Sequence, residues 1–387
     1  MFEHVDEIDW KALGFHIYGA HEKIPQEIRN LLSTDEAVRG EALDFLLGGG
    51  QDFGSIYETT PVIIPFILEV LAQEGAPGKA ALLRQLAGQG YQIATSGHLP
   101  VHEMDLYLRT YRALISKLDL YYDLLTNDLG EVQMAAVELL GTLAGDAQQV
   151  IPALVEQFNA QPDEDLQVAI LSAIKSLLAR LDWKRYDLKT QYASFMYDVT
   201  EHHASNKVRI TAARAAVETI HPYDEVSKRN LPDEVMKLLV QEFLNPVAVE
   251  SWRKESPLIY QEEIVQDLAR LNPAPLLELI ATPGLTPEQA FLLARGLLAN
   301  AFIFYEEQQQ EHWLKQPLFD KRNEGDYFVA ENYAMAPYPV FKTKKNILQA
   351  IVNAEAVWTR PTNLFSFFYG LPDNREQLRE WVSSIEE

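Results

Sequence analysis

Apolar positions along the chain repeat at the spacing of one helix face, and the same block of pattern returns several times. Residues 131–140 align without a gap with residues 165–174, and their apolar positions coincide. The start of the block returns at residues 207–213 and at residues 37–43. Apolar residues three and four positions apart predict an amphipathic helix, whereas strict alternation would predict a strand. Each block therefore predicts one helix of a repeating unit, and its small residues let neighbouring helices approach closely.

A second block consists of Ile-Pro followed by an apolar run. It begins at Ile24, Ile64 and Ile151. We interpret each proline as a helix start, because the first turn needs no amide hydrogen there and favours the fixed φ of proline. We also take each Ile-Pro helix as the second helix of its pair. Polar turn signals separate the blocks at residues 33–35, 127–130 and 161–165.

The order helix, turn, helix, turn predicts an all-α fold, an α-solenoid of stacked antiparallel HEAT-like helix pairs. A single pair cannot bury its apolar face, so the pairs must stack and enclose one long groove. Weaker copies of the pattern continue to residue 302. The domain prediction that follows is a repeat array over 1–303, an irregular insertion over 304–343, and a C-terminal helical cap over 344–387 that continues the array.

Composition and charge narrow the classes of partner. Apolar residues make up 47% and charged residues 23%, as expected for a folded protein with a substantial core. The net charge is -23, which repels phosphate backbones and anionic lipid heads, so we expect neither nucleic acid nor membrane as a partner. There is no cysteine, and residues 1–10 are acidic with no secretory pattern. The longest apolar run, 290–305, contains Arg295 and falls short of about 18 residues, so we expect a cytoplasmic protein.

The two ends of the chain resemble a bacterial family of HEAT-repeat domain proteins. The resemblance rests on residues 10–13, 16–20, 24–25, 39–43 and 57–68 near the start, and on Trp358 with residues 370–375 near the end. Members usually carry a His-Gln-Gly-Thr-like segment where this chain has residues 51–55, so the family's most polar candidate position is missing here. The resemblance implies a helical-repeat fold and no reaction. Similar repeat proteins act as adaptors or as immunity partners of secreted toxins.

No segment supplies the complete set of residues that a reaction or a metal needs. His98, His102 and Glu103 suggest a metal site, but Pro100 interrupts the helix that would align them, and a solvated loop fits better. The glycines of 48–54 and 88–90 lack the spacing of a phosphate-binding loop. No Gly-x-Ser-x-Gly elbow is present. We therefore expect no enzyme, no cofactor and no bound metal.

Two further segments have a structural and a functional interpretation. Residues 201–203, Glu-His-His, suit the carboxyl end of a helix, where cationic side chains complement the helix dipole. The aromatic run 365–369 could anchor a partner, but an end cap must cover the last repeat and aromatic side chains do this efficiently. We expect the structural role in both cases.

The distribution of charge is the one anomaly that points to a binding surface. No Lys or Arg occurs between Lys117 and Lys175, while acids are frequent there, and the segment 175–214 that follows is basic. Acids at helix starts cap free amides, which explains part of the excess, but not the missing cations. The candidate partner-binding residues are the acids Asp119, Asp123, Asp128, Glu156, Asp163, Glu164 and Asp165.

These observations predict a non-catalytic protein that binds another, basic protein, since a negative patch steers the approach of a positive one. The most specific form is an immunity protein that neutralises a basic toxin, and the alternative is a general adaptor or assembly scaffold. A nucleic-acid repair enzyme built on HEAT repeats is a remote third reading, because such a site needs a basic face.

Overall fold

The computed structural model describes residues 2–14, 20–48, 56–95, 101–181, 186–219, 232–245, 257–271, 274–298, 345–359, 371–372 and 374–384. Within these ranges the regular structure is helical and no strand is present. The predicted all-α class is confirmed for this part of the chain. The chain divides into two compact units, Met1–Thr219 and Ile220–Glu387.

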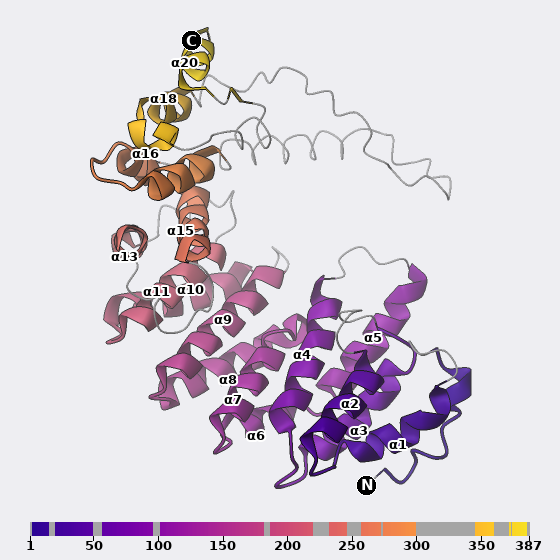
Figure 1. The fold of residues 1–387 in the computed structure, drawn as a ribbon. Coiled ribbons are helices and arrows are strands. Elements are labelled where there is room, and N and C mark those ends of the chain that lie inside the picture. The colour runs from indigo at the N-terminus through magenta and orange to yellow at the C-terminus, as the bar shows by residue number, and fades with distance from the viewer. Residues whose placement is uncertain are drawn as a thin grey trace. The chain divides into compact units, whose positions relative to one another are not determined.

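The helices of the first unit form two layers (Figure 1). The first layer holds the helices that carry the aligned sequence blocks together with α4, and its members pack side by side: α2 (Glu36–Leu47), α4 (Lys79–Thr95), α7 (Gly130–Leu140), α9 (Glu164–Arg180) and α11 (Asn206–Thr219). The second layer contains α1 (Ile24–Asn30), α3 (Thr60–Leu71), α5 (Val101–Ile115), α6 (Leu118–Leu125), α8 (Ala147–Ala160) and α10 (Tyr186–His202). Short 3-10 turns accompany them at η1 (Trp10–Ala12), η2 (His21–Lys23) and η3 (Ala144–Asp146).

The Ile-Pro helices lie in the second layer, and the sequence interpretation of them needs two corrections. Two of them are the first helix of a pair, because α1 packs on α2 and α8 packs on α9, whereas α3 packs mainly on α5. Proline marks a helix start only at Pro25, since Pro65 and Pro152 lie inside α3 and α8. Both of these prolines are exposed, so their rings displace no core side chain.

One position of the aligned blocks forms the same kind of hydrogen bond in every copy. Its long side chain donates a hydrogen bond to a carbonyl at or just beyond the end of the preceding helix, where carbonyls lack helical partners. The donor-acceptor pairs are Arg39 to Ser33 O at 2.8 Å, Gln133 to Leu125 O at 3.0 Å, Gln167 to Gln161 O at 2.8 Å, and Arg209 to Thr200 O at 2.7 Å. The repeated sequence block thus encodes a repeated link between the two layers.

The N-terminal segment covers the start of the second layer. Phe2 and Trp10 are buried, and their rings lie 6.1 Å and 6.4 Å from the ring of Phe66 on α3. The indole nitrogen of Trp10 donates to Val5 O at 2.9 Å. The segment therefore closes the apolar side that α3 would otherwise expose to water.

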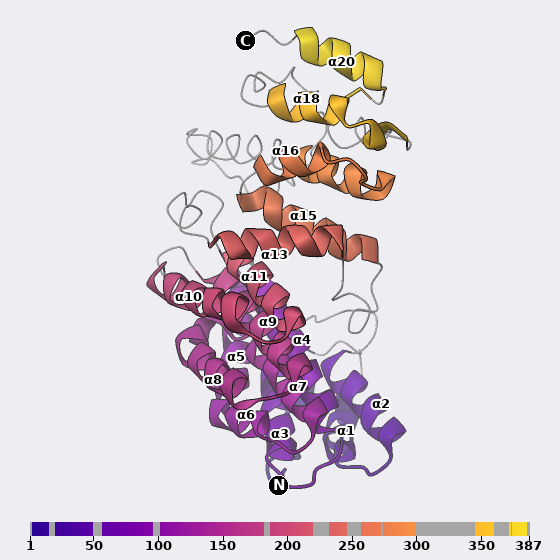
Figure 2. The same cartoon turned by 90° about the vertical axis from the view of Figure 1, so that its left-hand side faces the viewer.

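The second unit also consists of helices that follow one another in packing order (Figure 2). They are α13 (Asp233–Leu244), α15 (Pro257–Leu271), α16 (Ala274–Ile280), a helix over 287–298, α18 (Lys345–Asn353), η6 (Glu355–Thr359) and α20 (Arg375–Ser384). Long side chains again cap carbonyls: Gln261 donates to Phe243 O at 2.8 Å, and Arg375 donates to Val352 O at 2.8 Å.

The predicted domain bounds stay a prediction. The division at residues 219 and 220 falls inside the predicted 1–303 array. The predicted insertion, 304–343, lies outside the described residues, as does the aromatic run 365–369. Helices α18 and α20 occupy the predicted C-terminal cap. None of the described helices has the length and apolar character needed to cross a membrane.

Candidate functional site

Most of the predicted partner-binding acids meet along one edge of the first unit. Helices α6 and α8 both end at this edge, and α7 and α9 begin there. Gln157 of α8 donates to Leu125 O at the end of α6, at 2.8 Å, which places the two helix ends side by side. We call this surface the acidic edge, and it comprises Asp123, Asp128, Glu131, Glu156, Asp163, Glu164 and Asp165.

All members of the acidic edge are exposed, and only two of their carboxylates have a partner among the residues that the structure describes. Asp163 is the N-cap of α9 and accepts from Leu166 N at 2.9 Å. Asp165 pairs with Lys207 at the start of α11. Among the described residues, no Lys, Arg or His forms an ion pair with the other carboxylates. Their charge is therefore left to solvent or to a partner, because the 118–174 segment supplies no cation.

Asp119 lies next to the acidic edge. It occupies the first turn of α6, four residues or about 6 Å along the helix before Asp123, and on the same helix face. Burial first, then the charges of Asp146 and Asp119, raise the pKa of Tyr122 on this helix. Tyr111 donates to Asp146 Oδ2 at 2.6 Å. Asp119 thus continues the acidic edge along α6 by one turn.

The described cations Lys175, Arg180 and Arg214 of the basic segment that follows in sequence have partners within the protein. Lys175 binds Glu218 at 3.1 Å, and Arg214 lies 3.8 Å from the same carboxylate. Arg180 lies over the ring of Tyr91, 5.3 Å from its centroid, and donates to Gly141 O at 3.3 Å. Lys175 and Arg180 thus link neighbouring helices of the first layer, while Arg214 pairs within α11.

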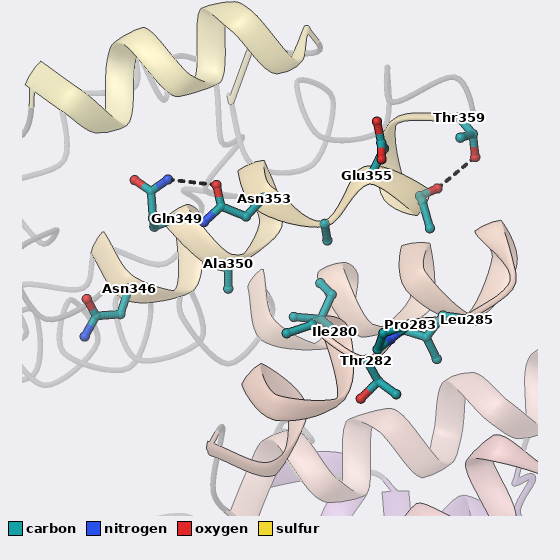
Figure 3. A pocket seen from close by; sticks show the side chains of 14 residues that line it. Ile280, Thr282, Pro283, Leu285, Asn346, Gln349, Ala350, Asn353, Glu355 and Thr359 are labelled. Atoms are coloured by element: carbon teal, nitrogen blue, oxygen red, sulfur yellow. Dashed lines mark hydrogen bonds between the residues drawn. The ribbon is translucent and has the colours of Figure 1, made fainter.

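A pocket of about 860 Å³ lies in the second unit, between α18 with η6 and the segment that follows α16 (Figure 3). One wall carries the amides of Asn346, Gln349 and Asn353 on α18. Gln349 donates to Asn353 Oδ1 at 3.2 Å. The opposite wall contains Ile280, Thr282, Pro283 and Leu285, as Figure 3 shows. Sequence analysis missed this pocket, and the polar spacing 346, 349, 353 on one helix face was the available signal.

The other chemical candidates gain no support from the structure. His102 and Glu103 lie in the first turn of α5, so this part is helical and not the loop we expected, while His98 and most of the 48–54 glycines lie outside the described residues. The Glu-His-His segment does end a helix: α10 stops at His202, whose Nδ1 lies 3.1 Å from Asp198 O. No group of three potential metal ligands occurs in the described part of the chain.

Comparison with known proteins gives no family. No family model and no curated protein match the chain. Among solved structures, a crystal structure of an engineered protein matches with 14% identity and a TM-score of 0.38, over 93% of this chain and 87% of that one. This likeness is too weak to carry an argument about fold or function.

Proposed function

We propose that this protein is a non-catalytic binding protein that uses the acidic edge to bind a basic protein. The observation that carries the proposal is the set of exposed carboxylates around two successive inter-helix turns, in a segment that contains no Lys or Arg; among the described residues only Asp165 has a cationic partner. An exposed surface of one charge raises the association rate of a partner with the opposite charge, and fixes the orientation of that partner.

The two-layer stacking of the first unit supports the finer architecture, a HEAT-like α-solenoid. Consecutive pairs in such an array present their turns in a row along an edge, so that charges on different repeats act together on one partner. A basic toxin has the required charge, which makes an immunity protein the most specific form of the proposal. A cellular adaptor would use the same edge, and the identity of the partner separates the two.

Affinity capture with matched variants tests the proposal. The edge variant carries Asp128→Asn, Glu156→Gln and Glu164→Gln, which remove charge without removing a hydrogen bond or ion pair among the described residues. The control variant carries Glu36→Gln, Glu41→Gln and Asp44→Asn on α2, where the side chains are equally exposed and equally without ion pairs. Both variants change the net charge by the same amount.

Each protein is immobilised and exposed to extract of the native host, and retained proteins are quantified across a salt series. We expect a basic protein to be retained by the wild type and the control variant. Retention on the edge variant should fall about tenfold, since about 1.4 kcal/mol of lost attraction has that effect. Equal retention on all three proteins would refute the role of the acidic edge.

A further inference from the structure

The pocket of the second unit has a lining that favours one class of ligand. Three amide side chains, Asn346, Gln349 and Asn353, stand at helical spacing along one wall, and we call them the amide row. Small side chains also line the pocket: Ala350, labelled in Figure 3, and Ala354. The pocket has the volume typical of sites that enclose a ligand, about 300 to 1,000 Å³.

Charge and residue type exclude several ligands. Among the described lining residues there is no Lys or Arg, so a phosphate or nucleotide would meet no cation from them. These residues include no aromatic ring either, so they offer a sugar or a base no stacking surface. Glu355 is the one ionisable side chain of this described lining, and a single carboxylate does not hold a metal ion. An uncharged or basic ligand with alternating donors and acceptors remains.

The amide row matches the hydrogen-bonding pattern of a peptide main chain. Each residue of an extended peptide presents one N–H and one C=O, and a carboxamide offers the complementary acceptor and donors. The bond from Gln349 to Asn353 leaves Gln349 Oε1 free to accept and Asn353 Nδ2 free to donate to a ligand. The row spans about 10 Å along the helix, the length of three extended residues.

We propose that this pocket binds an extended peptide segment of a partner protein through main-chain hydrogen bonds to the amide row. Small side chains of the peptide fit above the alanines, and a Lys or Arg follows at the end where Glu355 stands. The Glu355 side chain is 89% exposed, and its contact with Arg375 is long at 3.9 Å, so it can accept a second cation. This site lies in a different unit from the acidic edge and does not depend on it.

A display library of hexapeptides, acetylated and amidated at their ends, supplies the probe for the full-length protein. We expect the selected peptides to share small residues and one basic residue. Asn346→Ala and Asn353→Ala should each weaken their binding about fivefold, the effect of a hydrogen bond worth about 1 kcal/mol. Gln377→Ala, which removes an exposed amide on α20 outside the pocket, should change nothing. N-methylation of the central peptide nitrogens should abolish binding.

Two further variants separate this inference from the proposed function. Glu355→Lys should reverse the preference at one peptide end from basic to acidic, because it replaces the negative charge at that end of the pocket with a positive one. The edge variant should bind the selected peptides as well as the wild type does. The inference is overturned if no hexapeptide is selected, if N-methylation has no effect, or if binding follows the edge variant and ignores the amide row.

Discussion

Gly141→Ala tests how closely the helices of the first layer pack. Gly141 ends α7 with φ -62° and ψ -11°, a helical conformation that alanine adopts without strain. A Cβ atom at this position would lie 2.9 Å from Ala173 Cβ and 3.0 Å from Ala173 Cα on α9. Carbon atoms normally approach to about 3.5–4.0 Å, so α7 and α9 must separate by about 0.5–1 Å to admit the methyl group.

Two opposing effects set the size of the change in stability. Overpacking of this kind costs about 1–3 kcal/mol. Replacing glycine by alanine in a compatible conformation returns about 0.4–1 kcal/mol, because the unfolded chain loses freedom. We therefore expect Gly141→Ala to lower the free energy of unfolding by about 1–2 kcal/mol.

A double-mutant cycle with Ala173→Gly assigns the loss to this contact. The second substitution alone should cost about 1 kcal/mol, since it places glycine inside α9. In the double variant the Cβ–Cβ clash is gone while the tight approach to Ala173 Cα remains. The double variant should therefore be more stable than the sum of the single changes by about 1 kcal/mol.

Urea denaturation followed by circular dichroism at 222 nm gives the four free energies of the cycle. Strictly additive changes, or a Gly141→Ala protein more stable than the wild type, would show that α7 and α9 do not meet at this point. The stacked arrangement of the first layer would then need revision.

Three further predictions concern the side chains around the candidate surface. The free energy of unfolding of the edge variant should lie within about 0.5 kcal/mol of the wild-type value. Asp163→Ala should lower it by about 1 kcal/mol, because it removes the N-cap of α9. Urea titrations that show equal losses for the two variants would contradict the assignment. Tyr111→Phe removes the hydrogen bond to Asp146 and should cost about 1.5 kcal/mol in the same assay, and an unchanged midpoint would argue against that bond. Burial raises the pKa of Tyr121 above its usual value of 10.0, so the folded protein holds this proton more tightly than the unfolded chain does. Its contribution to stability is complete below pH 10 and declines as the pH rises further; stability measured from pH 8 to 11 should fall, and a flat profile would contradict the shift.

Local pattern determined the class of fold and the identity of its repeating helices. The blocks at 131–140, 165–174 and 207–213 became α7, α9 and α11, because the period of apolar residues along a helix is a property of neighbouring residues. The same holds for the helix end at His202. The pattern could not decide which helices pair. Whether α8 packs on the helix before it or on the helix after it depends on contacts between helix surfaces. The prediction from the Ile-Pro pattern, that α8 pairs with the helix before it, was wrong.

The acidic edge was also predicted in part from the sequence and decided in part by the tertiary structure. A segment free of Lys and Arg is visible in the sequence and predicts uncompensated acids. Only the tertiary structure decided that Asp165 meets Lys207 from 42 positions away, and that the end of α8 lies beside the end of α6. The pocket likewise joins residues 280–285 to residues 346–359. Ion pairs and pockets form between side chains that are distant in sequence. The period of apolar residues along one helix does not tell which distant residues will meet.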